Sequence, residues 1–405
     1  MVRPDSKTSL SRRTRAPALR ASRWPRGYRS IGLFDIFRQA ARRFALPTRI
    51  SAAARVAAAA SESIMPPDED SQHRRPADLP PDDFRRAMHR VADMAADYFE
   101  HVGRYPVRPP LRPGDVRKRL PDAPPRSPEA LDAILDDYQR VIEPAVTHWN
   151  HPGFMAYFAI TGSAPGVIAE TLSAALNVNA MLWRTGPAAT ELERLACDWL
   201  RQMIDLPDTF AGHINDTASI ASLLALAAAR HAAEPDIRDR GMAGRGDSPA
   251  LRVYCSEHAH SSIDKAVLTL GIGLNNLRRL PADEAFRMDP HALQQAIRED
   301  RAAGLRPLAV VATAGTTSTT SIDPLRPIAE VCAGERLWLH VDAAYAGSAA
   351  ICPEYRELLD GLELADSIVT NPHKWLFVPI DCSVMFVRDE RRLRDAFSVV
   401  PEYLR

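Results

Sequence analysis

Short apolar runs alternate with amphipathic segments through the second half of the chain, and this alternation restricts the possible folds most strongly. Four of the runs read RVYCS, LAVVATAG, LWLHVDAA and DSIVTNP, and they begin at Arg252, Leu308, Leu337 and Asp366. Strands that are apolar along their whole length are typical of a parallel sheet with helices on both faces. The sequence therefore predicts an α/β domain over residues 148–400, with ligands bound at the carboxyl ends of the strands.

The part of the chain before this domain has a different composition. Residues 1–64 contain 14 Arg and Lys but 3 Asp and Glu, which favours an unstructured extension or a false start before Met65 over a transit peptide. Residues 65–147 contain two segments with apolar residues at helical spacing, one over 81–102 and one that Ser127 is well placed to cap. These segments predict a helical N-terminal arm.

The overall charge and composition exclude several classes of function. Lys and Arg number 51 and Asp and Glu also number 51, so no net field attracts nucleic acid or an anionic membrane. No apolar stretch reaches the roughly 18 residues that a membrane span needs. The five cysteines are scattered without a CxxC pair, which is typical of a reduced compartment. We therefore expect a cytoplasmic protein that binds neither nucleic acid nor membrane.

Polar residues follow several of the predicted strands. Asp342 ends the run LWLHVD, and a carboxylate in that partly desolvated place needs a cationic partner. Thr317 follows Gly315 after the preceding strand, and His260 follows an earlier one. Each of these residues also has an ordinary structural explanation, such as a helix cap or a hydroxyl-rich turn. The histidines lack further ligands at a regular spacing, so no metal site is predicted.

Two more segments complete the pattern. Thr217, Ala218 and Ser219 precede an apolar helix, where free N–H groups form a natural phosphate site. Lys374 follows the last strand in the stretch SIVTNPHKWLFVP, although a buried ammonium is unfavourable unless it is paired or neutralised. All these groups at successive strand ends fit one cofactor, pyridoxal 5'-phosphate, whose aldehyde needs a lysine and whose ring nitrogen needs an acid.

The motifs NPHKW, HVDAAYAG, GTTSTTSID and AHSSIDKA together resemble those of the group II pyridoxal-phosphate-dependent amino-acid decarboxylases, most closely the aromatic-L-amino-acid decarboxylases. The resemblance extends from about Val91 to the C-terminus. It implies the fold of type I pyridoxal-phosphate enzymes, with a mostly parallel seven-stranded sheet, and a homodimer with active sites at the interface. The implied reaction converts an L-amino acid of the tyrosine, tryptophan or DOPA type to the amine and CO2.

The resemblance also implies roles for individual residues. Lys374 would be the lysine that forms the Schiff base, Asp342 would hold the pyridine nitrogen protonated, and His260 would stack on the ring. The other implied cofactor-binding residues, for the phosphate and the ring, are Ala218, Ser219, Thr317, Ala344, Asn371 and His373. Substrate-binding residues are expected in an aromatic cluster and just after it, at Trp149, Tyr157, Phe158, Ile160 and Thr161.

Departures from the family pattern leave other functions open. Ala159 and Ile160 replace a Pro-Thr pair, and Asn179 and Met181 take the places of pocket residues from the partner subunit. The family also continues beyond SVVPEYLR with a mobile loop and a further domain, so we expect weak cofactor binding and little productive decarboxylation without them. The alternatives are an aldehyde synthase, a decarboxylase of glutamate or diaminobutyrate, and an inactive cofactor-binding chain.

Overall fold

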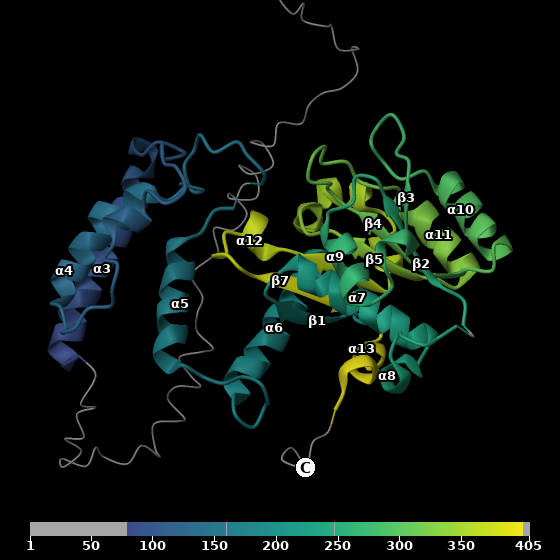
Figure 1. The fold of residues 1–405 in the computed structure, drawn as a ribbon, viewed down its shortest axis with the longest axis horizontal. Coiled ribbons are helices and arrows are strands. Elements are labelled where there is room, and N and C mark those ends of the chain that lie inside the picture. The colour runs from purple at the N-terminus through teal and green to yellow at the C-terminus, as the bar shows by residue number, and fades with distance from the viewer. Residues whose placement is uncertain (1–78, 159, 247, 400–405) are drawn as a thin grey trace, which may run out of the picture. The chain divides into compact units, whose positions relative to one another are not determined.

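A seven-stranded sheet forms the centre of the fold, in the order β1-β7-β6-β5-β4-β2-β3 (Figure 1). The computed structural model describes residues 79–158, 160–246 and 248–399, so the predictions for residues 1–64 lie outside the described residues. The strands are β1 (Ala211–Asn215), β2 (Leu251–Ser256), β3 (Leu277–Leu280), β4 (Arg306–Thr313), β5 (Trp338–Asp342), β6 (Ser367–Thr370) and β7 (Ser383–Val387).

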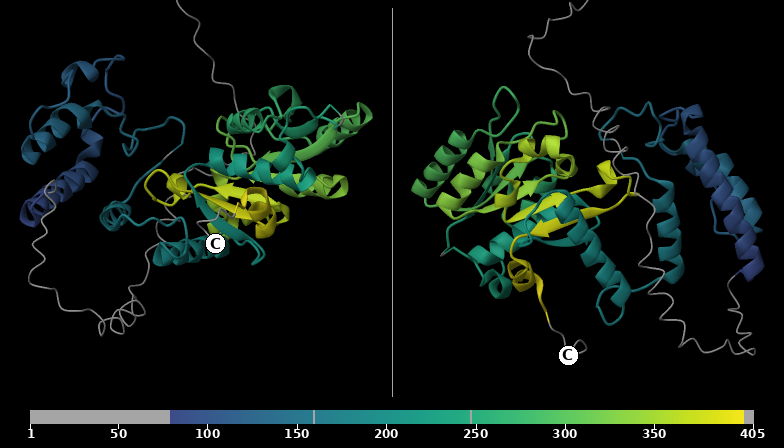
Figure 2. Two further views of the ribbon diagram at one scale, coloured as in Figure 1. Left: turned by 60° about the horizontal axis from the view of Figure 1, so that its bottom comes forward. Right: turned by 180° about the vertical axis from the view of Figure 1, so that it is seen from behind.

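The sheet is mostly parallel, as the sequence predicts. β2 pairs in parallel with β3 and β4, and the parallel pairing continues through β5 to β6. β7 is the exception, because it lies between β6 and β1 and runs antiparallel to both. Figure 2 shows from two further sides how the yellow β7 brings the teal β1 beside strands that come much later in the sequence. Since β1 is thereby parallel to the other strands, their carboxyl ends meet at one edge.

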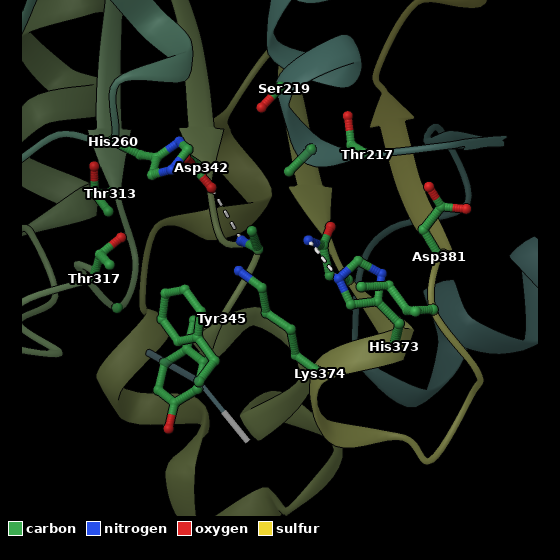
Figure 3. Close-up of a pocket in the computed structure, with 16 residues that line it drawn as sticks. Thr217, Ser219, His260, Thr313, Thr317, Asp342, Tyr345, His373, Lys374 and Asp381 are labelled. Atoms are coloured by element: carbon green, nitrogen blue, oxygen red, sulfur yellow. Dashed lines mark hydrogen bonds between the residues drawn. The ribbon is translucent and has the colours of Figure 1, made fainter. Parts of the chain in front are cut away.

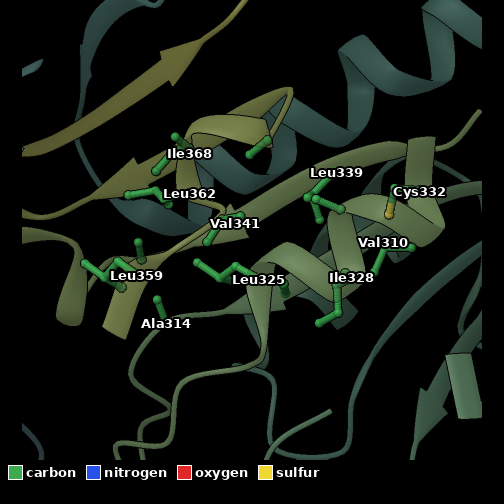
Figure 4. Close-up of a cluster of buried hydrophobic side chains, with 14 of the residues drawn as sticks. Val310, Ala314, Leu325, Ile328, Cys332, Leu339, Val341, Leu359, Leu362 and Ile368 are labelled. Carbon is green, nitrogen blue, oxygen red and sulfur yellow. The ribbon is translucent and has the colours of Figure 1, made fainter. Parts of the chain in front are cut away.

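Helices cover both faces of the sheet and form two hydrophobic cores. One core joins α6 (Pro187–Met203), α10 (Pro290–Ala302) and α11 (Leu325–Glu335) to side chains such as Leu339 and Val341. Figure 4 shows the part of this core around α11. The other joins α7 (Ala218–Ala233) and α9 (Ser262–Thr269) to side chains such as Val311 and Met385. Because both faces are covered, every residue of β5 is buried, including the polar residues His340 and Asp342.

The helices differ widely in length, and no helix in the described part of the chain is both long and apolar enough to cross a bilayer. They are α3 (Pro81–His101), α4 (Leu131–Asp137), α5 (Ala164–Leu176), α6 (Pro187–Met203), α7 (Ala218–Ala233), α8 (Ile237–Arg240), α9 (Ser262–Thr269), α10 (Pro290–Ala302), α11 (Leu325–Glu335), α12 (Pro372–Trp375) and α13 (Glu390–Phe397). Short 3₁₀ segments lie at Val102–Arg104, Arg117–Arg119, Glu143–Ala145, Leu274–Asn276, Ala346–Ile351, Pro353–Leu359 and Leu362–Leu364, and a π-helical turn lies at Tyr138–Ile142.

The N-terminal arm is helical but differs from the prediction at one point. Its first predicted helix is confirmed as α3. The prediction that Ser127 caps the second helix is wrong, because Ala130 has an extended backbone, with ψ of 135°, and the helix begins only at Leu131. An ion pair of 2.9 Å between Arg90 and Asp132 joins the two helices. The predicted boundary between this arm and the sheet domain stays a prediction.

Candidate active site

A cavity of about 190 Å³ lies at the carboxyl edge of the sheet, where the strand ends meet. Its lining comes mainly from the ends of β4 and β5 and from the segments that follow β1, β2, β4, β5 and β6 (Figure 3). All of the predicted cofactor-binding residues are in this lining, namely Ala218, Ser219, His260, Thr317, Asp342, Ala344, Asn371, His373 and Lys374. The rule that ligands bind at the carboxyl ends of parallel strands therefore locates the cavity from the sequence.

Lys374 lies on α12, directly after β6, and its amine points into the cavity (Figure 3). The amine nitrogen is 3.9 Å from the centre of the Phe158 ring. Burial lowers the pKa of Lys374, and the carboxylate of Asp342 opposes this shift only in part. Among the residues that the structure describes, none forms an ion pair with Lys374. These surroundings favour the neutral amine, which is the nucleophilic form of lysine.

Asp342 occupies the cavity wall at the end of β5 and is only 6% exposed. Its Oδ1 accepts a hydrogen bond of 3.2 Å from the N–H of Ala344. Thr313 pairs with Asp342 across β4 and β5, and its buried Oγ1 has no hydrogen-bond partner among the described residues. A buried hydroxyl without a partner is unfavourable, so this wall favours a ligand with a polar atom.

The N-terminus of α7 forms another wall of the cavity. Thr217 caps this helix, since its Oγ1 accepts a hydrogen bond of 3.3 Å from the N–H of Ile220. Within the described ranges, the N–H groups of Ala218 and Ser219 donate no hydrogen bond. Free N–H groups at a helix N-terminus favour an anion such as phosphate.

Two histidines lie on different sides of the cavity (Figure 3). Nδ1 of His260 accepts a hydrogen bond of 3.2 Å from the N–H of Ser262. Nδ1 of His373 accepts one of 3.0 Å from the N–H of Cys382. Burial, and then the charge of Lys374, lower the pKa of His373. This shift favours the neutral imidazole of His373, which adds no charge beside the lysine.

The predicted substrate residues are only partly brought together. Phe158 lines the cavity, and its ring centre lies 5.0 Å from that of Tyr345. Trp149 and Tyr157 instead stack on each other at 5.7 Å, and Tyr157 is 78% exposed. Neither of these two rings is part of the cavity lining, so their role in substrate binding stays a prediction.

The described positions that depart from the family pattern, and the adjacent Thr161, also lie outside this lining. Ile160 and Thr161 are half-buried, and Ala159 lies outside the described residues. Asn179 accepts a hydrogen bond of 2.9 Å from the N–H of Met181, and both residues are exposed. Their assignment to a substrate pocket, which for the last two involves a partner subunit, stays a prediction.

Some residues of the lining were not predicted, namely Thr313, Tyr345, Ile380 and Asp381. The position of Thr313 in the predicted run LAVVATAG could have suggested it, because it is the last residue of β4 and ligands bind at such strand ends. Tyr345 stands in the same motif as Asp342 and could have been found there. Ile380 and Asp381 carry no local signal, because they lie in the connection from α12 to β7 and reach the cavity only through the tertiary fold.

The family described as "Pyridoxal-dependent decarboxylase conserved domain" matches residues 113–405, which is more than half of the chain and includes the whole cavity lining. The chain belongs to this family. Membership confirms the family that the motifs resemble and the class of cofactor that the strand ends predict.

Two curated relatives of this decarboxylase-family chain show how far the similarity extends. Phenylacetaldehyde synthase from Petunia hybrida is 43% identical over 335 residues, which cover 81% of this chain and 65% of that protein. Aromatic-L-amino-acid decarboxylase from Bos taurus is 44% identical over 338 residues, which cover 80% of this chain and 68% of that protein. The chain thus spans less than two thirds of the length of the Petunia relative.

A solved structure has the same fold. The crystal structure of TDC from Oryza sativa, with PLP and tryptamine, matches with a TM-score of 0.76 and 40% identity, over 81% of this chain and 68% of that chain. This match confirms the predicted fold of type I pyridoxal-phosphate enzymes, with helices on both faces of a mostly parallel sheet.

We predict that the amine of Lys374 loses its proton below the usual pH range for lysine in the cofactor-free protein. Burial disfavours the ammonium form, which lowers the pKa. Reductive methylation with 13C-formaldehyde and NMR across pH measure the midpoint, and Lys374→Arg identifies the signal. Asp342→Asn removes the carboxylate that favours the ammonium and should lower the midpoint further. A midpoint in the usual range would contradict the burial of this amine.

Proposed function

We propose that this chain binds pyridoxal phosphate in the cavity and decarboxylates an aromatic L-amino acid to its amine and CO2. The observation that supports this proposal most directly is the amine of Lys374, which is largely desolvated on the wall of the same cavity as Asp342 and forms no ion pair among the described residues. Lysines whose burial favours the neutral amine are suited to covalent attachment of a carbonyl group. We assign this site to the domain predicted over residues 148–400.

The cavity fits the cofactor group by group. The free N–H groups of Ala218 and Ser219 suit the phosphate, and the carboxylate of Asp342 suits the ring nitrogen. The buried hydroxyl of Thr313 lacks a partner, which a polar atom of the bound cofactor would supply. Lys374 supplies the amine for the aldehyde. Donors, acid and nucleophile are therefore all present on the walls of one cavity.

The residues of the chain supply the charges and proton positions that the chemistry needs. When bound, pyridoxal phosphate withdraws the electrons that the departing carboxylate leaves on the Cα of the amino acid. Asp342 holds the proton on the ring nitrogen, because a neighbouring carboxylate favours positive charge there. Lys374 offers a neutral amine for attachment. His260 is exposed and lines the cavity, which supports the proposal that its ring covers the flat ring of the cofactor by stacking.

Aromatic side chains around the lysine support an aromatic substrate. The ring centres of Phe158 and Tyr345 are 5.0 Å apart, and those of Tyr345 and Trp375 are 5.2 Å apart. Because Phe158 also contacts the amine of Lys374, an amino acid bound there would meet apolar ring surface. The bovine relative is named for aromatic L-amino acids, and the rice structure contains tryptamine, an aromatic amine.

An aldehyde product is the second candidate function. It is favoured by one observation, since the Petunia relative, at 43% identity, is named phenylacetaldehyde synthase. Decarboxylation of glutamate or diaminobutyrate is a weaker alternative, because no arginine among the described residues lines the cavity to bind a side-chain carboxylate. An inactive cofactor-binding chain is the remaining alternative.

We also propose a cytoplasmic homodimer with active sites at the interface. The helix α5 is apolar, yet none of its residues is buried in the single chain. Such an apolar patch is typical of an interface, and a second copy would cover it. The cysteines of the described residues are free, which fits a reducing compartment. Apolar side chains that are more than half exposed on and near α5 and α6 are Ile168, Leu172, Leu176, Met181, Trp183, Leu192 and Trp199.

A product assay across a panel of L-amino acids tests the proposal. The purified chain is incubated with pyridoxal phosphate and, separately, tryptophan, tyrosine, DOPA, phenylalanine, glutamate and diaminobutyrate. We expect CO2 and an equal amount of amine, released at a low rate, from one or more aromatic acids, and neither product from Lys374→Ala. Aldehyde in place of amine would support the second candidate. Product from glutamate or diaminobutyrate alone, or no product although the cofactor is bound, would contradict an aromatic decarboxylase.

Asp342→Asn should retain the cofactor but lower turnover by about 10²–10³-fold, because the amide cannot hold the ring nitrogen protonated. Cofactor absorbance after gel filtration measures retention, and CO2 release measures turnover. Asp264→Asn is the matched control, since Asp264 lies on α9 in an ion pair of 2.5 Å with Arg279. Turnover in Asp342→Asn equal to that of the control would show that Asp342 does not serve the ring nitrogen.

A further inference from the structure

A buried histidine next to the active site has no part in the chemistry proposed above. His340 lies on β5, two residues before Asp342, and its side chain is 0% exposed. Because side chains alternate along a strand, His340 and Asp342 belong to the same face of the sheet. Burial lowers the pKa of His340 to about 4, so the ring is neutral at pH 7.

Both ring nitrogens of His340 lie at hydrogen-bond distance from serine hydroxyls. Nε2 is 3.1 Å from Oγ of Ser222 on α7, and Nδ1 is 2.9 Å from Oγ of Ser367 on β6. Nε1 of Trp338 donates a further hydrogen bond of 2.8 Å to Oγ of Ser367. A buried network in which these groups are paired has a defined geometry, because leaving any member without a partner is unfavourable.

This network joins the elements that carry the walls of the active site. Ser222 lies about one turn after the free N–H groups at the start of α7. Ser367 begins β6, which leads to Lys374. His340 lies on β5, which ends at Asp342. The histidine therefore connects the expected phosphate site to the strands that present the acid and the lysine.

The other buried contacts of α7 with the sheet described here are apolar, and apolar contacts are not directional. The buried face of this helix consists mostly of alanine, and Ala221, Ala225 and Ala228 are each 0% exposed. Apolar contacts hold the helix against the sheet, but they are non-directional and specify its position along the strands less sharply than a hydrogen bond does. The hydrogen bond between Ser222 and His340 is directional and does fix it.

We propose that His340 is a positioning residue that holds the N-terminus of α7 at a fixed distance from Asp342. This distance has to match the separation of the phosphate and the ring nitrogen within one cofactor molecule. The inference rests on the proposed cofactor site. It gives His340 no contact with the cofactor or with the reacting atoms.

Variants that keep one of the two hydrogen bonds test this role. His340→Gln places an amide near the position of Nε2 and preserves the contact with Ser222, whereas His340→Asn places one near Nδ1 and preserves the contact with Ser367. Ser222→Ala removes the contact from the helix side. Val341→Ala is the matched control, because Val341 is also buried on β5 but packs in the opposite core, away from α7.

Two measurements report on position and on binding. Hydrogen–deuterium exchange of the peptide over residues 216–222 follows the start of α7 in the cofactor-free protein. Dissociation constants for pyridoxal phosphate and for pyridoxal, from quenching of protein fluorescence, separate the phosphate contribution from that of the ring. A general loss of stability would weaken the binding of both ligands alike, whereas a displaced phosphate site would weaken the binding of pyridoxal phosphate alone.

We expect His340→Asn and Ser222→Ala to speed hydrogen–deuterium exchange of this peptide. The same variants should weaken the binding of pyridoxal phosphate roughly two- to tenfold relative to the binding of pyridoxal, which is the effect of one lost hydrogen bond. His340→Gln and Val341→Ala should keep the wild-type ratio. Wild-type exchange and an unchanged ratio in His340→Asn and Ser222→Ala would overturn the positioning role. If the wild-type protein binds neither ligand, the proposed function fails, and the exchange result alone decides the positioning role.

Discussion

Desolvation of the Lys374 amine is the constraint on which the rest of the site depends. The lysine follows β6, which is buried along its whole length beside the equally buried β5, so the amine is held near the interior of the domain. A charged amine in such a place is unfavourable without a partner, and its lowered pKa reflects this. Attachment of a carbonyl group requires the neutral form of the amine, which burial next to the sheet already favours. Fold and chemistry therefore support each other.

In the proposed function, the single charge of Asp342 serves both the lysine and the cofactor. Its carboxylate favours positive charge in the cavity. In the cofactor-free protein, this charge partly opposes the lowering of the pKa of Lys374 by burial. A protonated ring nitrogen would receive the same stabilisation. The parallel order of β4, β5 and β6 brings the two residues to one edge, and β7 brings the start of α7 to the same edge from a much earlier part of the chain.

The sequence was most informative where local pattern and three-dimensional position coincide. Residues at the carboxyl end of an apolar strand, such as Asp342 and Lys374, must reach the same edge, so the strand pattern alone brings them together. Trp149 and Tyr157 have no such constraint, and an aromatic cluster in the sequence became a stack outside the cavity. His340 was missed because its partner Ser222 is 118 residues away in the chain, and no local pattern encodes that contact.

Covalent capture of the cofactor measures the central role of Lys374 directly. The protein is mixed with pyridoxal phosphate, reduced with borohydride and digested, and the phosphopyridoxyl group is located by mass spectrometry. Attachment of the cofactor to the buried amine predicts the label on Lys374, its loss in Lys374→Ala, and its retention when the exposed Lys265 is changed to Ala. Label on Lys265 in place of Lys374, or equal label in wild type and Lys374→Ala, would contradict this role.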